Sequence, residues 1–504
     1  MLLALLAVPV WESLDQWHFG QGYDDSVYFV TAKALATGHG YRVLSLPGEP
    51  YAVKYPPIYP LFLSLAWRIQ PEFPQNLRVA AVMQALLLPV FVALLLGTLR
   101  RMGLSWRRIF LSAALTLVTL QMAMMSITLF SELLFLCLLL LAMQVIEKAS
   151  VNDDRWLAMA AGALTGLAYL TRSAALPMLV AAPVFYVLRK RGRLIPYFLA
   201  AAVPMAALWH AWTFLHGGSG ADPANGTYLN EYAKIIHVTG FWSNFLRQLS
   251  ALSGSVAENI WPGILQGTAG LPLFHIALAA AIMGAVRIGR REQWPVYVIF
   301  SGFYLAMIVF WWFDGLARLT VPVWPMLVAG IGEEMSHLAA IAEKDLSGRR
   351  WQTVPRWALI ALGLYMIFRT DRVTTEKIFA MVHREQKMRE QDVPAFSWIV
   401  AHKEQGTVLA AWKDATAYLY TGAPASRGLF VGLSPLGEDS EASATPLSAL
   451  PEQYQRGLLV LLRSDLGDAL DGTRLSPFRN AAESLRSAQL EFDSPGASVY
   501  RFSR

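Results

Sequence analysis

The stretch VAAVMQALLLPVFVALLLGTLRRMGLSWRR, residues 79–108, places a continuous apolar segment directly before a cluster of arginines. The apolar part, residues 79–99, has about the length of roughly 20 residues that a helix needs to cross a bilayer. Arginine and lysine concentrate in the cytoplasmic loops of membrane proteins. The stretch therefore predicts a transmembrane helix that ends at a cytoplasmic connector, residues 100–108.

Apolar segments of the same kind recur along the chain. Together they predict about eleven transmembrane helices, at residues 1–10, 79–99, 109–126, 131–146, 156–171, 174–188, 194–215, 271–286, 294–312, 319–331 and 356–369. We expect the first to be short, or truncated by the choice of start codon. Three more basic connectors separate the segments, at residues 189–193, 287–291 and 348–356. The number of segments between the connectors lets all four lie on the cytoplasmic side at once.

The composition agrees with a chain that lies mostly in a membrane. Of its 504 residues, 55% are hydrophobic and 15% are charged, whereas soluble proteins have about 25% charged residues. The formal net charge of +6 comes largely from the basic connectors. The positive charge therefore indicates how the chain is oriented in the membrane, where lipids are its partners. We expect no nucleic-acid partner.

Several kinds of chemistry are excluded by what the sequence lacks. Cys137 is the only cysteine, so neither an intrachain disulfide framework nor a thiolate metal site can form. The nucleotide-binding patterns GxxxxGK and GxGxxG are absent, and the cytoplasmic loops are too short to fold a nucleotide-binding domain. We therefore expect no cofactor and no reaction driven by ATP or a nucleotide sugar.

The opposite, outer side is expected to carry two long loops and a separate domain. The loops span residues 12–78 and 216–270, and the second is expected to help select an acceptor. After about residue 370 the charge density is ordinary, and stretches such as GTVLAAWKDATAYLYTG (406–422) predict strands and short buried segments. We expect a transmembrane domain over residues 1–370 and a small soluble α/β domain over residues 371–504.

Two adjacent acids, Asp24 and Asp25, open the stretch GYDDSVYFVTAKALATGHGY (22–41), whose apolar residues recur at helical spacing. One explanation is an N-cap, because Asp accepts hydrogen bonds from the unpaired amides of a first helical turn. A helix has one N-cap position, however, so capping does not account for both acids. The other carboxylate is free to act as a general base in a cavity.

Further charged residues interrupt apolar stretches on the same outer side: Lys54, Glu132, Arg172 and Arg318. An ionised group near the bilayer centre costs about 2.5–3.5 kcal/mol, so such residues are rare unless they are paired or functional. Each has a structural alternative: lipid-headgroup contact for Lys54, helix-dipole stabilisation for Glu132, interfacial anchoring for the arginines, and an Asp314 pair for Arg318. Converging cations on this side would suit a lipid-linked phosphate leaving group.

These motifs, taken in order, resemble those of the polyprenyl-phosphate-sugar-dependent GT-C glycosyltransferases, the superfamily of protein O-mannosyltransferases and lipid A aminoarabinose transferases. The resemblance rests on GYDDSVYFVTAKALATGHGY, KYPPIYPLF (54–62), SELLFLCLLLL (131–141), YLTRSAALPML (169–179) and ARLTVPVWPML (317–327). WIVAHKEQGTVLAAWKDATAYLYTG (398–422) is similar to the start of the soluble domain in bacterial members. The resemblance thus covers most of the chain.

The resemblance implies a GT-C membrane fold with interfacial helices in the first outer loop, and a single-displacement sugar transfer at the outer face of the membrane. The short loops and the appended domain indicate that this is a bacterial plasma (inner) membrane. Asp24 would be the general base, with Asp25 capping the helix or assisting. Lys54, Arg318 and Arg172 would bind the phosphate of the polyprenyl donor. Glu132 and Tyr55 would shape the substrate pocket, and no metal is expected.

Two other functions fit a polytopic chain with charged residues among its helices. A transporter or lipid-linked glycan flippase has no need of a first loop as long as residues 12–78, nor of a domain after the last helix. A non-catalytic membrane scaffold would tolerate substitution of Asp24, whereas an enzyme would not. Neither the sugar nor the acceptor, whether lipid, glycan or protein, is specified by the sequence.

Overall fold

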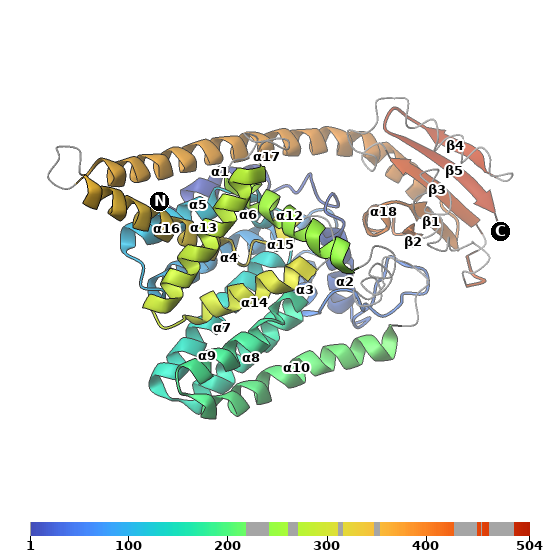
Figure 1. Ribbon diagram of the computed structural model, residues 1–504. Coiled ribbons are helices and arrows are strands. Elements are labelled where there is room, and N and C mark those ends of the chain that lie inside the picture. Colours follow the sequence, from blue (N-terminus) through green and yellow to red (C-terminus); the bar gives the residue numbers. More distant parts are fainter. Residues whose placement is uncertain are drawn as a thin grey trace.

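A helical body and a small C-terminal sheet make up the computed structural model of the chain (Figure 1). The structure describes residues 2–217, 241–260, 271–310, 316–346, 353–427, 451–454, 456–462 and 488–503. The second long loop expected at 216–270 lies largely outside these residues. The mainly helical fold class with a small C-terminal mixed sheet is confirmed.

Every one of the eleven apolar segments coincides with a helix. The helices are α1 (Ala4–Glu12), α4 (Asn76–Arg101), α5 (Trp106–Leu117) with α6 (Leu120–Ile127), α7 (Glu132–Asn152), α8 (Arg155–Thr171), α9 (Met178–Leu188), α10 (Ile195–His216), α13 (Leu271–Arg291), α14 (Val296–Phe310), α16 (Trp324–Asp345) and α17 (Val354–His402). Short 3-10 turns, η1 (Ser173–Ala175) and η2 (Gly192–Leu194), precede α9 and α10, and α12 (Phe241–Ile260) precedes α13.

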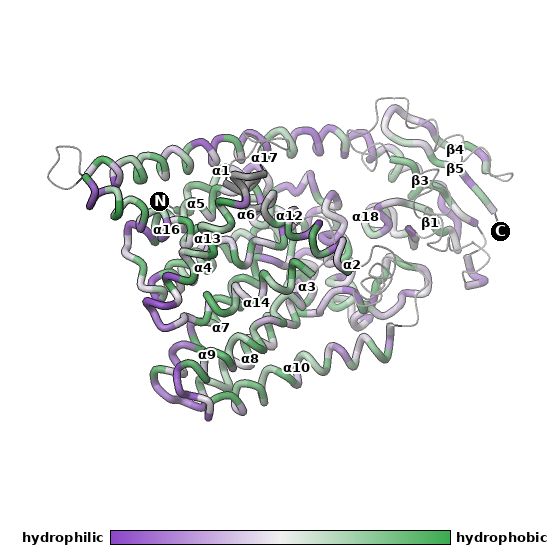
Figure 2. Tube along the Cα trace, in the orientation of Figure 1, coloured by the Kyte–Doolittle hydropathy of each residue, from purple (hydrophilic) through white to green (hydrophobic). Residues whose placement is uncertain are grey.

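Among the described residues, three helices are both long and apolar enough to cross a membrane: α4, α7, and α10 together with η2. A fourth crossing arises if α5 and α6, which meet at 67°, form one bent span. Figure 2 shows hydrophobic residues along α4, α7 and α14. The chain is therefore a multi-pass membrane protein, although eleven crossings are not confirmed.

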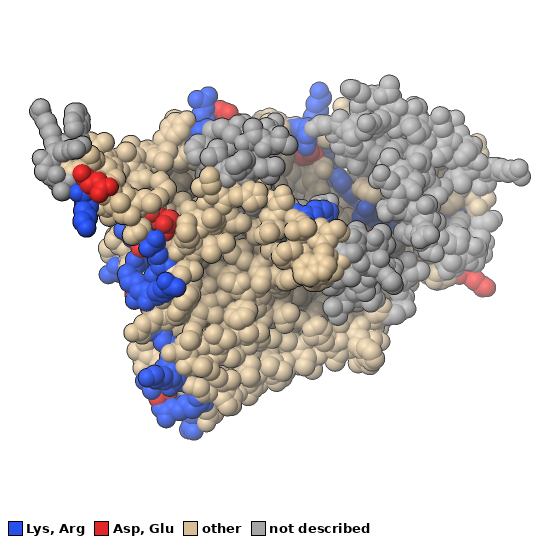
Figure 3. Space-filling model, in the orientation of Figure 1, with Lys and Arg blue, Asp and Glu red and all other residues tan. Residues whose placement is uncertain are grey.

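The described residues of the basic connectors gather at one end of the helical body, here called the basic end (Figure 3). Arg189 from one connector donates to Gln293 after the next (2.7 Å), and Arg191 pairs with Asp153 (3.0 Å). Arg108 pairs with Glu333 on α16 (2.7 Å). These contacts join described parts of the connectors 100–108, 189–193 and 287–291 to neighbouring helices and loops at one end of the body, as expected.

Helices α2 (Asp24–Ala36) and α3 (Ile58–Ile69) lie in the first long loop and pack on each other at the opposite end of the body (Figure 1). Tyr28 of α2 packs against Tyr55 and Tyr59, with ring centroids 4.7 and 5.1 Å apart. Trp67 of α3 donates its indole N–H to the carbonyl of Phe29 (3.0 Å). The helices expected in this loop are thus present and are joined by buried aromatic contacts.

The C-terminal sheet domain, residues 403–503, contains α18 (Asp414–Thr421) and a five-stranded sheet of order β2-β1-β3-β5-β4. The strands are β1 (Thr407–Ala411), β2 (Ala425–Ser426), β3 (Arg456–Leu462), β4 (Gln489–Asp493) and β5 (Ala497–Ser503). Strand β1 is parallel to β2 and β3, whereas β5 is antiparallel to β3 and β4. This mixed sheet matches the expected small α/β fold.

Helix α17 joins the helical body to the C-terminal sheet domain without a break (Figure 1). Its 49 residues extend over about 70 Å, at a rise of 1.5 Å per residue. Ile378 and Val382 are buried in the core of the body, whereas Phe396 and Ile399 are buried in the core of the sheet domain. The division expected after residue 370 lies inside this helix.

Helices α13 and α16 approach each other closely at Gly284 and Gly330. A Cβ added at Gly330 would lie 2.2 Å from the carbonyl oxygen of Ala281, which is backbone and cannot rotate away. A Cβ added at Gly332, two residues further along α16, would have no neighbouring atom within 4 Å. The same substitution should therefore have opposite effects at these two sites.

We predict that Gly330→Ala destabilises the detergent-solubilised protein by about 1–3 kcal/mol, because the two helices must move apart. Gly332→Ala is the matched control and should be neutral or stabilising by up to about 1 kcal/mol, since alanine favours the helix. Thermal unfolding of both variants checks this. Equal melting temperatures would contradict the close packing of α13 on α16.

Candidate functional site

The two acids of the first loop lie in the first turn of α2, directly after the loop GQGY (residues 20–23). Tyr23 occupies the N-cap position with φ at +58° and makes no side-chain cap. The expectation that one acid is the N-cap residue is therefore wrong. Asp25 nevertheless accepts from two amides, those of Ser26 (2.9 Å) and Gly20 (2.7 Å). Its carboxylate thus fastens the loop to the start of the helix.

Asp25 is completely buried behind this loop. Burial raises the pKa of its carboxyl to about 6, because the charged form loses water, and the amide hydrogen bonds from Gly20 and Ser26 oppose that rise. Asp25 therefore titrates at mildly acidic pH, well above the range of an ordinary aspartate. Both of its oxygens point at backbone amides, which gives it a structural task that its neighbour does not share.

Asp24 faces the opposite way, into a cluster of charged side chains. Its Oδ2 accepts from Nη1 of Arg318 (2.8 Å), and its Oδ1 accepts from the hydroxyl of Tyr55 (2.5 Å). About a fifth of the side chain, 21%, is exposed. Asp24 is thus ion-paired and still accessible.

Glu132, the first residue of α7, lies on the other side of the same arginine. It pairs with Nε of Arg318 and with Nη1 of Arg172 (2.9 Å), and its side chain is 3% exposed. Arg172 also donates to the hydroxyl of Ser131 (3.0 Å), which is 3.1 Å from the hydroxyl of Tyr28. Two carboxylates and two guanidiniums therefore balance each other, as buried charges must.

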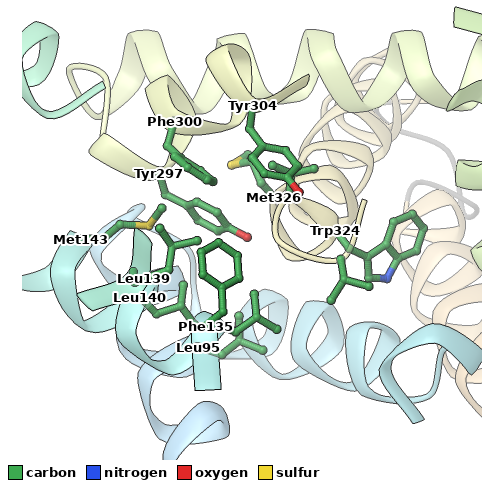
Figure 4. Packing of buried hydrophobic residues seen from close by; sticks show 14 of the residues in the cluster. Leu95, Phe135, Leu139, Leu140, Met143, Tyr297, Phe300, Tyr304, Trp324 and Met326 are labelled. Carbon is green, nitrogen blue, oxygen red and sulfur yellow. The ribbon is translucent and has the colours of Figure 1, made fainter. Parts of the chain in front are cut away.

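Arg318 lies in the short helix α15 (Leu316–Leu319), and its position is set by the turn in which this helix ends. Two tyrosines of α14 hold this turn: Tyr304 donates to the carbonyl of Leu319 (2.9 Å), and Tyr297 donates to the carbonyl of Pro322 (2.9 Å). Figure 4 shows both tyrosines among the buried side chains between α14 and α7. The core of the body thus fixes the arginine of the site.

The guanidinium of Arg318 also lies over the ring of Phe130, 4.0 Å from its centroid. The same ring touches the loop before α2, since a Cβ at Gly22 would lie 2.3 Å from it. A Cβ at Gly20, whose φ is +86°, would lie 2.4 Å from Thr416 of α18. The two glycines let the loop pass between Phe130 and the C-terminal sheet domain.

Lys54 lies beside this cluster. Its ammonium is 6.0 Å from the ring centroid of Tyr55, the residue whose hydroxyl contacts Asp24. The two prolines after Tyr55 lead into α3, whose N-cap is Pro57, and proline is well tolerated at a helix start. The sequence-predicted Asp24, Tyr55, Glu132, Arg172 and Arg318 thus form one cluster, with Asp25 behind it and Lys54 at its side.

Sequence reasoning missed four groups that support the cluster: Tyr28, Phe130, Tyr297 and Tyr304. Their types carry no signal in a chain with many aromatic residues, because they act through hydrogen bonds and ring contacts made across the fold. Asp314, the alternative partner of Arg318, lies outside the described residues. Within the described residues no group of three His, Cys, Asp or Glu side chains is placed to hold a metal ion.

The cluster has the features of an anion site. In the described part of the chain, Nη2 of Arg318 is buried and has no hydrogen-bond partner. Leaving a buried polar group unpaired costs about 1–3 kcal/mol. An anionic oxygen brought to Arg318 would remove that cost, and guanidinium groups bind phosphate and carboxylate groups well.

Comparison with known proteins identifies the fold. No protein-family model and no curated protein matches the chain. Among solved structures, ArnT from Cupriavidus metallidurans bound to undecaprenyl phosphate has 14% identity and a TM-score of 0.54, over 99% of this chain and 97% of that one. The apo state of the same ArnT has 13% identity and a TM-score of 0.52, over 95% and 93%.

A third solved structure, the Archaeoglobus fulgidus oligosaccharyltransferase tethered with an acceptor peptide, has 14% identity and a TM-score of 0.51. It covers 100% of this chain and 74% of that one. The fold that the sequence resemblance implied is therefore confirmed over nearly the whole chain, including the C-terminal sheet domain.

We predict that Glu132→Gln destabilises the protein by about 3–5 kcal/mol, because it leaves two largely buried guanidiniums with half of their compensating charge. The control is Glu376→Gln, which breaks an exposed helical pair with Arg372 (2.8 Å) and should cost at most about 1 kcal/mol. Denaturant unfolding in detergent measures both. Similar losses in the two variants would contradict the buried four-charge cluster.

Proposed function

We propose that the chain is an integral membrane glycosyltransferase. It moves a sugar from a polyprenyl-phosphate-linked donor to an acceptor at the outer face of the plasma (inner) membrane, by a single, inverting displacement. The observation that carries this proposal is the ion-paired cluster of Asp24, Glu132, Arg172 and Arg318. It lies at the end of the body away from the basic connectors, on a fold shared with ArnT bound to undecaprenyl phosphate.

The position of the basic connectors supports the assignment of sides. Positively charged connectors are typically cytoplasmic, so the opposite end of the body would face outward. The part after residue 370, which includes the second half of α17 and the C-terminal sheet domain, would then lie outside the cytoplasm. A lipid-linked donor is already activated and needs no nucleotide on that side.

The arginines would bind the phosphate of the donor. Arg318 and Arg172 come from different segments and converge on Glu132, with Lys54 nearby beside Tyr55. Positive groups fixed in place before the reaction stabilise the negative charge that builds up on a leaving group. As the bond between the sugar and the phosphate breaks, the electron pair would remain on a phosphate held by these cations.

Asp24 would act as the general base. The acceptor oxygen forms a bond to the anomeric carbon on the face opposite to the leaving phosphate, and its proton passes to the carboxylate. An ionised carboxylate has about four lone-pair positions, of which Arg318 and Tyr55 occupy two. A phosphate that also binds Arg318 would weaken its pair with Asp24, so donor binding would leave the base more able to accept a proton.

Glu132 would act as the counter-charge that keeps both arginines in place. Its burial and its two ion pairs suit a group that remains ionised while the substrate changes. Tyr55 would orient Asp24 and contribute to the wall of the substrate pocket. The acceptor is open among lipids, glycans and proteins, because the second long loop lies largely outside the described residues.

The base is tested by Asp24→Asn, which keeps the size of the side chain and removes its basicity. We predict that the variant binds donor lipid but transfers sugar about 10²- to 10⁴-fold more slowly. The control Asp15→Asn removes an exposed acid 3.7 Å from Arg78 and should transfer at the wild-type rate. Transfer from a labelled polyprenyl-phosphate sugar in purified protein measures this, and a wild-type rate for Asp24→Asn would remove Asp24 from the role.

The phosphate site is tested by binding of polyprenyl phosphate to Arg318→Ala and Lys54→Ala. Loss of a hydrogen bond to a charged group costs about 1.5–3 kcal/mol, so affinity should fall roughly 10- to 100-fold in each variant. The control Arg372→Ala removes a 70% exposed arginine of α17 and should bind as the wild type does. Unchanged affinity in either test variant would exclude that residue from the site.

A further inference from the structure

The loop before α2 is held from the C-terminal side by three charged residues. Lys413, which directly precedes α18, donates to the side-chain oxygen Oε1 of Gln21 (3.0 Å). The side-chain nitrogen Nε2 of Gln21 donates to Oε2 of Glu385 on α17. Arg389, one turn further along α17, donates to the carbonyl of Phe19 (2.6 Å). Two elements far along the chain therefore fasten two residues of a loop only a few positions before Asp24.

These charged residues are buried rather than on the surface: Lys413, Glu385 and Arg389 are 9%, 3% and 5% exposed. Removing charged groups from water is costly unless they are paired or hydrogen-bonded. Contact with solvent, the usual role of charged side chains on a protein surface, therefore does not explain why these three lie against the loop. The contacts with Gln21 and Phe19 are the kind of satisfied buried polar network that selects one conformation.

The network continues to the candidate base through the backbone. Gly20 lies between Phe19 and Gln21, and its amide donates to Asp25 (2.7 Å), the neighbour of Asp24. The loop lies against Thr416 at Gly20 and against Phe130 at Gly22, so it has little room to shift. A change in the position of Gln21 would be passed to Asp25 and from there to the first turn of α2.

We propose that the C-terminal sheet domain positions the candidate base. Lys413, through Gln21 and the bond between Gly20 and Asp25, holds the loop so that Asp24 faces Arg318 and Tyr55. Lys413 is a positioning residue, because its hydrogen bond to Gln21 acts on Asp24 through the loop and Asp25. This inference rests on the proposed function for its kinetic consequence, but its structural consequence can be measured without it.

The charge of Lys413 adds a readout that loss of packing would not produce. Two charged groups act on Asp25: Asp24 from α2 and Lys413 from the sheet domain, while Glu385 and Arg389 of α17 contact the loop. Lys413 favours the ionised form of Asp25, so removing it raises the pKa of Asp25. The ionised carboxylate of Asp25 accepts the two amides that fasten the loop. Without Lys413, this carboxylate would become protonated at a higher pH as the pH is lowered, and the loop would be released there.

The sheet domain should remain docked when Lys413 is changed, because other contacts join it to the first loop. The amide of Ala425 donates to the carbonyl of Ser45 (2.7 Å), and the ammonium of Lys33 lies 4.9 Å from the ring centroid of Tyr418. Phe73 and Tyr420 pack edge to face at 4.9 Å. Lys413→Met therefore removes the polar link and leaves the interface.

The test compares Lys413→Met with Lys403→Met in detergent-solubilised full-length protein. Lys403 donates to the carbonyl of Thr421 (2.6 Å) within the sheet domain and is partly buried, so it is a control amine whose described hydrogen bond stays inside that domain. Hydrogen exchange of the peptide covering residues 16–25 should be at least about tenfold faster in Lys413→Met and unchanged in Lys403→Met. Equal exchange in both variants would overturn the proposal.

Kinetics with a labelled polyprenyl-phosphate sugar provide the second arm. In Lys413→Met, kcat should fall roughly 10- to 100-fold, because the base is misplaced, while KM for the donor changes less than about twofold. The acidic limb of the pH profile should move to higher pH, and Lys413→Arg should restore both. A raised KM with unchanged kcat, or an equal loss in Lys403→Met without a pH shift, would overturn the proposal.

Failure of the proposed function is seen separately, as absence of transfer by the wild-type protein. The hydrogen-exchange comparison then still decides whether the sheet domain holds the loop.

Discussion

The guanidinium of Arg318, shared between Asp24 and Glu132, is the interaction on which the arrangement of the site depends. It joins three segments that are far apart in the chain: the first long loop, the start of α7 and the short helix α15. Arg172 adds a fourth segment through Glu132. Because isolated charges are costly to bury, each of these segments is stable in its position only when the others are present.

The surrounding fold serves this charge cluster from two directions. From within the body, Tyr304 and Tyr297 hold the end of α15, the short helix that carries Arg318, and the turn that follows it. From the C-terminal side, α17 and Lys413 hold the loop that carries the two acids. The acids divide the work: Asp25 accepts backbone amides, whereas Asp24 remains partly exposed and faces the cations. A continuous α17 therefore connects the helical core to the placement of the candidate base.

Much of the fold could be predicted because membrane helices leave a strong local signal. Each apolar segment coincides with a helix, and the described parts of the arginine-rich connectors meet at one end. The length of α17 was underestimated because the sequence after residue 370 becomes charged, although no Gly or Pro occurs between residue 370 and Pro394. A loss of hydrophobicity marks the exit from a bilayer but does not end a helix.

For the site, sequence reasoning selected residues whose charge is out of place in apolar surroundings, and the structure places most of them together. What each does stays a prediction. Sequence reasoning could not find the positive φ of Tyr23 at the N-cap of α2, which is unusual for a residue with a Cβ. It also could not find the contact between Lys413 and Gln21. Such contacts join residues almost 400 positions apart, and neither residue carries a local pattern that indicates the other.

The most direct test of the central claim is mass spectrometry of polyprenyl-phosphate sugars in membranes that contain the chain and its natural acceptor. With the wild-type chain, the sugar should leave the donor and free polyprenyl phosphate should accumulate. With Asp24→Asn, the donor should remain intact although it is bound. A donor pool that stays unchanged in the presence of the folded wild-type chain, or that falls equally with both chains, would contradict sugar transfer at this site.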